Sequence, residues 1–394
     1  MFKLKKTKYF TEICLFNFPI YKKRKRVLFV SPLSPNDIAN PIAILDCAPY
    51  LRQRGFKVDV CKFPDFPAIK KFDIIALSCI GNYSETIIDQ IEKTKEFYPE
   101  TTVIVGGKWA VTMSEEEKNK LHEMNVTVEQ GPAELVFTTD NEIDYSRYPA
   151  WDKKDFDILY TREHLMTSRG CPFHCHFCNN TEKKISYFTP DRTVKNIELV
   201  FSKRDDVFFC DDVFVTNFDH AKAIYDLCKK RKIEIENRNS FFVHVNLVND
   251  KTIELIKLFK PFRVSIGIES GSQTILDKMN KRTKVERIRE VVPVLAQHAN
   301  INALWLIGYP YETVETLEAT YTLMKELKPY VKNNFVSCYM PLPHTVGYTM
   351  ALETGGTFLP KWNTTRPSFV PYGLSEEILA DYRNRMMMQF NEEE

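Results

Sequence analysis

The chain has 394 residues, of which 44% are hydrophobic and 27% charged, and its formal net charge is +2 at pH 7. This length exceeds what one hydrophobic core usually serves, so we expect two or more domains. The near-neutral charge argues against a nucleic-acid partner. Ten cysteines are too few for a disulfide scaffold, which favours a reducing cytoplasm. No apolar run approaches the roughly 20 residues that span a bilayer.

Residues 1–26 form a basic and aromatic leader. Four lysines precede the short apolar stretch ICLFNFPIY, and KKRKR (22–26) follows it. A signal peptide would need a longer apolar region and a small-residue cleavage site. Two interpretations remain: a frayed basic tail, or a weak contact with an anionic membrane surface, where each basic residue contributes about 1 kcal/mol.

Residues 27–140 alternate apolar runs with helical periodicity. The strands predicted here are VLFVSPL, FKVDVCKF, DIIALSCI and TTVIVGG, and NPIAILDCAPYLRQRG (40–55) is an amphipathic helix. Strands separated by helices imply crossovers and a parallel sheet, and apolar strands without alternation fit a sheet covered on both faces. We therefore predict an α/β, Rossmann-like, doubly wound domain.

The rest of the chain divides into three segments. Residues 141–163 are rich in Asp, Tyr and Pro without a clear period and are predicted to be a linker. Residues 164–343 again alternate strands and helices, with six predicted strands beginning at HLMTSRG (164–170). Six βα units are two short of a closed barrel, so we predict a partial (β/α)6 barrel. Residues 344–394 show no clean pattern and are described as a C-terminal extension.

Three cysteines, Cys171, Cys175 and Cys178, lie within TSRGCPFHCHFCNN (167–180), just past the first predicted barrel strand. Structural zinc would need a fourth ligand, such as a histidine of the same loop. A disulfide would leave one thiol over and suits an oxidising compartment. An iron–sulfur cluster held by three thiolates leaves one iron open to a chelating ligand. Adjacent loop residues rarely surround one ion from all sides, which argues against zinc, but all three options stay open on the residues alone.

The CxxxCxxC spacing after a first barrel strand, with the aromatic Phe177 before the last cysteine, resembles the signature of radical S-adenosylmethionine (SAM) enzymes. This resemblance implies that Cys171, Cys175 and Cys178 hold a [4Fe–4S] cluster whose fourth iron binds the amino and carboxylate groups of SAM. An electron, supplied by a donor such as flavodoxin or ferredoxin, then cleaves SAM. The resulting 5′-deoxyadenosyl radical abstracts hydrogen from an unreactive C–H bond.

The cysteine segment also contains two histidines and an arginine. We expect His174 and His176 not to be ligands, because these clusters prefer thiolate. Arg169 precedes the loop, and either places positive charge near the cluster or has a structural role.

The resemblance also implies SAM-binding residues at the ends of other strands. Glu269 and Ser270 close the predicted strand ending in GIES, Asp211 and Asp212 close FCDD, and Gly308 lies in LIGYPYE. Each has a structural alternative. The acids can serve as helix caps or first-turn acids, and a lone glycine can simply relieve crowding.

The N-terminal domain resembles the cobalamin-binding domain that precedes the barrel in class B methyltransferase-like radical SAM enzymes. Ser78 and the pair Gly106 and Gly107 match positions that contact the nucleotide tail of cobalamin, and EQGPAEL (129–135) resembles a GEGE turn. The segment SPLSPNDIANP (31–41) lacks the cobalt-ligating histidine of other cobalamin domains. The resemblance implies bound cobalamin and methyl transfer to carbon or phosphorus, while a scaffold without cofactor stays open.

Three functions compete on these grounds. The first is a cobalamin-dependent radical SAM methyltransferase, and the second a radical SAM epimerase, dehydrogenase or cyclase without cobalamin. The third is a zinc-stabilised binding protein without catalysis.

His344 stands in MPLPHTVG (340–347) where relatives have glycine, so we interpret it as a substrate contact or a plain loop residue. The leader resembles those of enzymes from surface-polysaccharide loci, which suggests a glycan or another small-molecule substrate.

Overall fold

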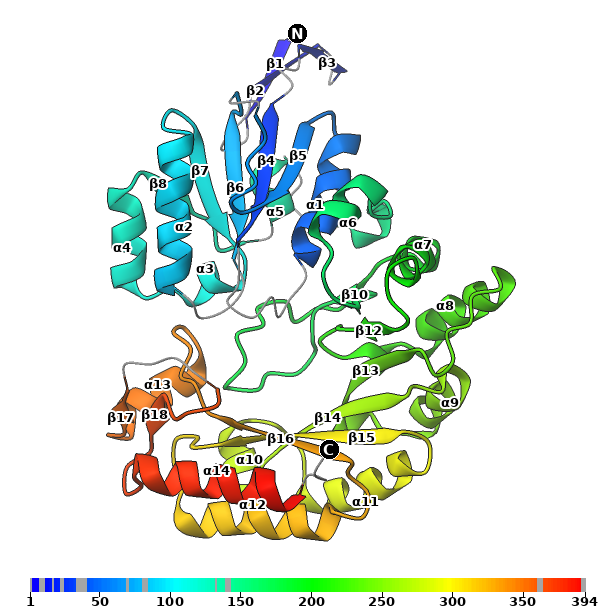
Figure 1. The fold of residues 1–394 in the computed structure, drawn as a ribbon, viewed down its shortest axis with the longest axis vertical. Coiled ribbons are helices and arrows are strands. Elements are labelled where there is room, and N and C mark those ends of the chain that lie inside the picture. The colour runs from blue at the N-terminus through cyan, green and yellow to red at the C-terminus, as the bar shows by residue number, and fades with distance from the viewer. Residues whose placement is uncertain are drawn as a thin grey trace. The chain divides into compact units, whose positions relative to one another are not determined.

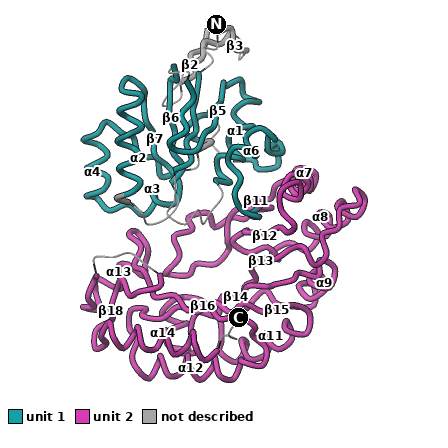
Figure 2. The backbone as a smooth tube through the Cα atoms, in the orientation of Figure 1, with its two compact units in different colours: residues 1–164 teal, residues 165–394 magenta. Residues whose placement is uncertain are grey.

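The computed structural model describes residues 2–6, 11–15, 18–21, 25–32, 41–68, 71–79, 84–131, 133–138, 143–359 and 364–390. Of residues 2–21 it describes the backbone. The chain divides into two compact units, residues 1–164 and 165–394 (Figure 2).

Unit 1 contains a five-stranded parallel sheet with the order β5-β4-β6-β7-β8. Its strands are β4 (Arg26–Ser31), β5 (Lys57–Lys62), β6 (Ile74–Ser78), β7 (Thr102–Gly106) and β8 (Val126–Val128). The four predicted strands are confirmed, and β8 is an addition. The strand order grows outward in both directions from β4, which is the doubly wound arrangement that was predicted.

The helices of unit 1 cover this sheet (Figure 1). They are α1 (Ile42–Gln53), α2 (Ser84–Phe97), α3 (Lys108–Thr112), α4 (Glu115–Glu123) and α5 (Ala133–Phe137). Right-handed crossovers place α1 and α2 on opposite faces, because the chain moves along the sheet in one direction from β4 to β5 and in the other from β6 to β7. The central strand β4 is accordingly buried from Val27 to Val30.

The leader differs from the frayed tail that was one of its two interpretations. Residues in its described part form a three-stranded antiparallel sheet in chain order, made of β1 (Phe2–Lys6), β2 (Thr11–Leu15) and β3 (Phe18–Tyr21). Most of the basic run KKRKR, residues 22–24, lies outside the described residues.

The segment 141–163 was predicted to be a linker, and its described part instead packs onto unit 1. It contains the short 3-10 helix η1 (Tyr145–Arg147) and helix α6 (Lys153–Leu159). The indole of Trp151 donates to Asp46 Oδ1 at 2.7 Å, and Arg52 Nη2 of α1 donates to Asp155 Oδ1 at 3.0 Å. These two helices are too short to show a period in the sequence, and aromatic burial holds the segment in place.

Unit 2 is built on a six-stranded sheet that follows chain order, β9-β12-β13-β14-β15-β16 (Figure 1). The strands are β9 (His164–Leu165), β12 (Val207–Phe209), β13 (Asn239–His244), β14 (Arg263–Glu269), β15 (Asn300–Ile307) and β16 (Asn333–Cys338). Neighbours from β12 to β16 pair in parallel. Because β9 and β16 are the two edges and do not pair, the sheet stays open. The partial barrel of six βα units is confirmed.

Helices connect these strands. They are α7 (Pro190–Phe201), α8 (Phe218–Lys230), α9 (Asp250–Phe259), α10 (Gln273–Lys278), α11 (Val285–Ala296) and α12 (Val314–Leu327), with 3-10 turns η2 (Phe214–Thr216) and η3 (Val245–Leu247). The first predicted strand is divided: β9 is followed by β10 (Ser168–Arg169), which pairs antiparallel with β11 (Ser186–Tyr187) outside the main sheet.

The C-terminal extension is more ordered than its sequence pattern indicated. It contains α13 (Val346–Glu353), the antiparallel pair β17 (Thr357–Phe358) and β18 (Phe369–Val370), and α14 (Glu376–Phe390). Helix α14 buries Leu379, Tyr382, Met386 and Phe390. It is tied to β16, where Arg383 Nε donates to the Val336 carbonyl oxygen at 3.0 Å. Among the described residues, no helix is long and apolar enough to cross a membrane.

Candidate active site

The cysteine loop begins at a glycine with a left-handed backbone. Gly170 has a φ of 97°, and a Cβ there would lie 2.3 Å from the Lys184 carbonyl oxygen. Such a conformation favours glycine. The Cys171 N–H donates to the Glu182 carbonyl oxygen at 2.9 Å. The loop therefore folds back on residues 182–184, and its first cysteine is held where the chain leaves β10.

The three predicted cluster ligands differ in burial. Cys171 and Cys175 are half-buried and Cys178 is exposed. The charge of Cys178 raises the pKa of Cys171, and the charges of Cys178 and Cys171 raise the pKa of Cys175, in both cases after burial as the larger cause. The Phe173 N–H donates to Cys171, and the Asn180 N–H donates to Cys178 Sγ at 3.4 Å. Burial raises the pKa of Cys175 to about 11. Metal binding at this loop must therefore release protons.

This donor set suits a cluster better than one ion. Within the described ranges, no group of three or more His, Cys, Asp or Glu side chains is arranged to hold a metal ion. A zinc site would need such a convergence on one point. A four-iron cluster is larger, with iron and sulfide at alternate corners of a cube, so each thiolate binds a different iron from outside. Three thiols on one loop, with N–H donors to two of the sulfurs, fit that requirement.

The loop is anchored on the segment after α10 and on the start of α13. The His176 N–H donates to the Met279 carbonyl oxygen at 2.8 Å, and its Nδ1 bonds the Lys278 carbonyl oxygen at 2.9 Å. Gly347 N–H donates to the His176 carbonyl oxygen at 2.8 Å. His174 is exposed, and its carbonyl oxygen accepts from the Asn280 amide. The contacts of His176 are those of a structural residue.

Glu269 forms a buried ion pair beside the cysteines. Its Oε1 accepts from Lys281 Nζ at 2.7 Å, and the two side chains are 13% and 6% exposed. Glu269 has a φ of 70° where β14 shifts register against β15. A Cβ at Gly267 would lie 2.6 Å from Glu269 Oε1, so the glycine leaves room for the pair.

Lys281 links this ion pair to the thiols. Burial opposes its charge, but Glu269, Cys175 and Cys171 outweigh burial, and the pKa of Lys281 is raised. Its ammonium also lies 5.9 Å from the centre of the Phe177 ring. The structure thus brings Glu269 and Phe177, two predicted site residues, together with the cysteine loop.

Asp211, predicted to be a SAM ligand or a helix-capping acid, has a structural role in this fold. It is fully buried, and its carboxylate accepts from the N–H and hydroxyl groups of Thr167 and Ser168 at 2.5–3.1 Å. Burial raises its pKa to about 6. The side chain therefore holds the chain before the cysteine loop. Its neighbour Asp212 is exposed, borders the loop, and accepts from the Asn180 amide at 2.6 Å.

Ser270 and Gly308 also have structural contacts. Ser270 is fully buried, with its Oγ 3.1 Å from Thr320 Oγ1 and accepting from the Ser272 N–H, so it fixes the turn from β14 to α10. Gly308 has a φ of 78°, and a Cβ there would lie 3.2 Å from Leu379 Cδ1. Its lack of a side chain relieves crowding against α14, which was the structural alternative.

In unit 1, the predicted glycine pair divides into two roles. Gly107 has a φ of 91°, and a Cβ there would lie 2.4 Å from the Cys79 carbonyl oxygen, so its glycine is required by the backbone itself. A Cβ at Gly106 would meet nothing closer than the Glu129 carbonyl oxygen at 3.5 Å. Ser78, half-buried, pairs with Gly106 at the carboxyl edge of the sheet. The backbone therefore does not require glycine at position 106, in contrast to position 107.

Two segments of unit 1 to which the sequence analysis assigned a role lie partly outside the described residues. Residues 33–40 of the segment expected to lack a cobalt ligand are outside the described residues, as is residue 132 of EQGPAEL. In unit 2, His344 is exposed with a φ of 67°. This left-handed backbone explains why glycine suits that position.

Sequence reasoning missed His244 and Lys281. His244 ends β13, and its ring stacks on Phe173 of the cysteine loop with centroids 3.6 Å apart. The signal for His244 was a histidine at the carboxyl end of a predicted barrel strand, FFVHVNLV. Lys281 carries no such signal, because it lies between α10 and α11 and is brought to Glu269 by the turn after α10.

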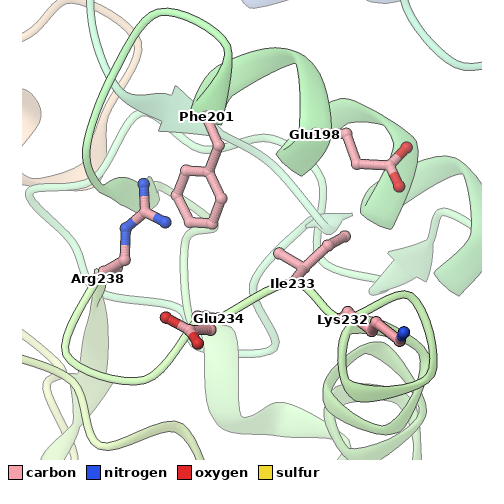
Figure 3. A pocket seen from close by; sticks show the side chains of 6 residues that line it. All are labelled: Glu198, Phe201, Lys232, Ile233, Glu234 and Arg238. Carbon is pink, nitrogen blue, oxygen red and sulfur yellow. The ribbon is translucent and has the colours of Figure 1, made fainter.

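A pocket in unit 2 lies at the opposite edge of the sheet (Figure 3). It is lined by Glu198, Phe201, Lys232, Ile233, Glu234 and Arg238. These residues belong to the end of α7 and to the loop that enters β13, so the pocket lies at the amino ends of β12 and β13. Barrel chemistry is found at the carboxyl ends, and the guanidinium of Arg238 is stacked 3.9 Å from the Phe201 ring. This pocket is separate from the candidate site.

Comparison with known proteins identifies the domain. Residues 165–324 match the family model of the Radical SAM superfamily. These residues therefore form a radical SAM domain, as the cysteine motif predicted.

The chain is also similar to an individual curated protein. The anaerobic magnesium-protoporphyrin IX monomethyl ester cyclase of Rubrivivax gelatinosus is 26% identical over 234 residues, which are 56% of this chain and 41% of that protein. This chain thus spans less than half of the length of that relative.

Two solved structures share the fold over both units. The cobalamin-dependent SAM radical enzyme OxsB, with aqua-cobalamin and SAM bound, has a TM-score of 0.66 at 14% identity, covering 83% of this chain and 55% of that one. The radical SAM methyltransferase TsrM from Kitasatospora setae, with tryptophan and a SAM analogue bound, has a TM-score of 0.65 at 15% identity. That match covers 92% of this chain and 83% of TsrM. These matches confirm the α/β fold class. Sequence identities this low give no information about the substrate.

Proposed function

We propose that this protein is a radical SAM enzyme that holds a [4Fe–4S] cluster at Cys171, Cys175 and Cys178 and transfers a methyl group with the help of cobalamin. The observation that carries the proposal is the position of the three thiols. They lie on one loop next to the carboxyl ends of β13 and β14, within electrostatic reach of one another and of Lys281.

The residues around the loop would have different functions: charge compensation, recognition of SAM and exclusion of water. When bound, the cluster supplies the electron that cleaves SAM and thus the radical that abstracts hydrogen. Lys281 offsets the negative charge that accumulates on thiolates, and Glu269 keeps Lys281 charged and oriented. Glu269 and the exposed Asp212 border the space in which the SAM amino group would be recognised. Phe177, packed with Met279, Tyr309 and Tyr339, excludes water from one side.

The corrinoid part of the proposal rests on unit 1 and on the fold. Gly106 and Ser78 lie at the carboxyl edge of a doubly wound sheet, where such folds bind ligands, and the backbone does not require glycine at position 106. Both OxsB and TsrM share this fold. Bound cobalamin would supply the methyl group. The competing reaction is a cobalamin-independent cyclisation, epimerisation or dehydrogenation. Among these, cyclisation has the support that a relative from Rubrivivax gelatinosus is named a cyclase.

Substrate, partners and location are part of the same proposal. We expect a small molecule or glycan as substrate, a flavodoxin or ferredoxin as electron donor, no nucleic acid, and a weak membrane-surface contact through the basic leader. A cytoplasmic location suits thiols that must stay reduced.

His344, exposed beyond β16, is the residue that we propose to contact the substrate. Unchanged turnover after His344→Ala would contradict that role.

Anaerobic purification followed by analysis of iron, sulfide and cobalt tests the function. We expect iron and sulfide in the proportions of a [4Fe–4S] cluster, a brown chromophore, and 5′-deoxyadenosine formed from SAM under reduction. Replacing the three cysteines with alanine must abolish all three. Cys210→Ala, which removes a thiol that instead bonds the Leu165 carbonyl oxygen, must leave them intact. Cobalt in the purified protein separates methyl transfer from the cobalamin-independent reactions, and a colourless protein with zinc refutes the proposal.

A further inference from the structure

His244 is a buried histidine at the edge where the cysteine loop lies. It is the last residue of β13 and is 6% exposed. Its ring is nearly parallel to that of Phe173, at an interplanar angle of 9° and a centroid distance of 3.6 Å. Phe173 lies between Cys171 and Cys175 in sequence, and its N–H donates to Cys171. One aromatic contact thus connects His244 to the first predicted cluster ligand.

The hydrogen bonds of the His244 ring define its tautomer. The Asn246 N–H donates to Nδ1 at 3.2 Å. A nitrogen that accepts a hydrogen bond carries no hydrogen, so in the neutral ring the hydrogen is on Nε2. Nε2 is buried and has no hydrogen-bond partner within the described part of the chain. A buried N–H without an acceptor is unfavourable, and each such group in a folded protein calls for an explanation.

The surroundings keep this ring neutral. Burial, and then the positive charge of Lys281, lower the pKa of His244 to about 3. The same Lys281 acts on Cys171 and Cys175 and pairs with Glu269. His244 is therefore a neutral N–H donor in the group of side chains that surrounds the thiols.

We propose that His244 Nε2–H donates a hydrogen bond to the cofactors bound at the cysteine loop, either to a sulfur of the cluster or to an oxygen of SAM. This inference rests on the proposed function and adds a positioning residue to it. A donor to a cluster sulfur stabilises the reduced, more negative cluster and so raises its potential. A donor to a SAM oxygen instead strengthens SAM binding.

A matched set of variants tests the proposal. His244→Phe keeps an aromatic ring for Phe173 to stack on and removes the donor. His244→Gln returns an amide donor near the position of Nε2. His298→Phe makes the same chemical change at the amino end of β15, away from the loop. For each reconstituted protein we would measure iron content, the midpoint potential of the cluster without SAM, and the dissociation constant for SAM.

If the acceptor is a cluster sulfur, His244→Phe makes the potential more negative and His244→Gln restores most of it. If the acceptor is a SAM oxygen, the potential stays unchanged, and the dissociation constant for SAM rises about 3- to 10-fold, as expected for one hydrogen bond. His298→Phe changes neither quantity. Should His244→Phe fail to retain iron, His244→Leu replaces it in the comparison with His244→Gln.

An unchanged potential together with unchanged SAM affinity in a donor-free variant that retains its iron overturns the role of His244. That outcome leaves the proposed function standing. Failure of the proposed function looks different, because the unaltered protein would then hold no iron–sulfur cluster.

Discussion

The ammonium of Lys281 lies 2.7 Å from the carboxylate of Glu269, and both side chains are largely withdrawn from water beside the cysteine loop. Removing one member of such a pair leaves an uncompensated buried charge. We expect Lys281→Met to lower the free energy of unfolding of the iron-free protein by about 3–5 kcal/mol. The double change Lys281→Met with Glu269→Gln should recover most of that loss in urea unfolding.

A surface ion pair serves as the control. Arg289 and Glu326 make a comparable contact at 2.6 Å, but their side chains are 45% and 42% exposed. Arg289→Met should therefore change stability by less than about 1 kcal/mol. Equal losses in the single and double variants of the buried pair would contradict this account.

Gly347 joins α13 to the cysteine loop, and its lack of a side chain makes the contact possible. A Cβ there would lie 2.5 Å from the Tyr339 hydroxyl oxygen and 3.0 Å from the His176 carbonyl oxygen. We expect Gly347→Ala to cost about 1–3 kcal/mol of stability, as overpacking does, and to lower the iron content after reconstitution. Gly131→Ala is the control, because a Cβ there meets nothing within 4 Å. Full iron content in Gly347→Ala would show that the loop does not depend on this contact.

The adjacent glycines of unit 1 should respond differently to alanine. Gly107→Ala combines a left-handed backbone with a contact of 2.4 Å to the Cys79 carbonyl oxygen, so we expect a loss of about 2–4 kcal/mol in stability. Gly106→Ala meets an ordinary contact of 3.5 Å and should leave stability nearly unchanged while lowering corrinoid retention. Thermal unfolding and cobalt analysis measure the two effects. Undiminished cobalt in Gly106→Ala would place the corrinoid elsewhere.

Glu312 makes stability depend on pH. Burial raises its pKa to about 7, although Thr316 and the Gly308 N–H donate to its carboxylate. An unfolded glutamate has a pKa of about 4.3. Because the folded pKa is the higher one, the stabilising contribution of the protonated form is full below about pH 4.3 and is lost as the pH rises through about 7.

We therefore expect the free energy of unfolding of the native protein, relative to Glu312→Gln, to fall by roughly 3 kcal/mol between about pH 4.3 and 7, at about 1.4 kcal/mol per pH unit. Urea unfolding of both proteins across this range measures the difference. A difference that does not vary with pH would show that Glu312 is charged throughout.

The elements that were predicted from the sequence have a clear hydrophobic pattern within their own residues. The elements that were missed do not show such a pattern clearly. All strands of the two main sheets except β8 were predicted, because they lie in apolar runs; β8 has only three residues. Segment 141–163 was misread as a linker because α6 has seven residues, too few to display a period. Helix α14 was missed although Leu379, Tyr382 and Met386 recur at helical spacing, since methionines and charged residues between them obscure the apolar face.

The sequence by itself determined the chemistry of the site. Three cysteines on one short loop after a strand predict a cluster, because ligand type and spacing are properties of a contiguous segment. Tertiary structure alone decided which other residues surround that loop. It turned Asp211 and Ser270 inward to hydrogen-bond the backbone, and it brought Lys281 and His244 to the thiols from different βα units. Whether a polar side chain faces a ligand or the core depends on neighbours distant in sequence, and folding sets those contacts.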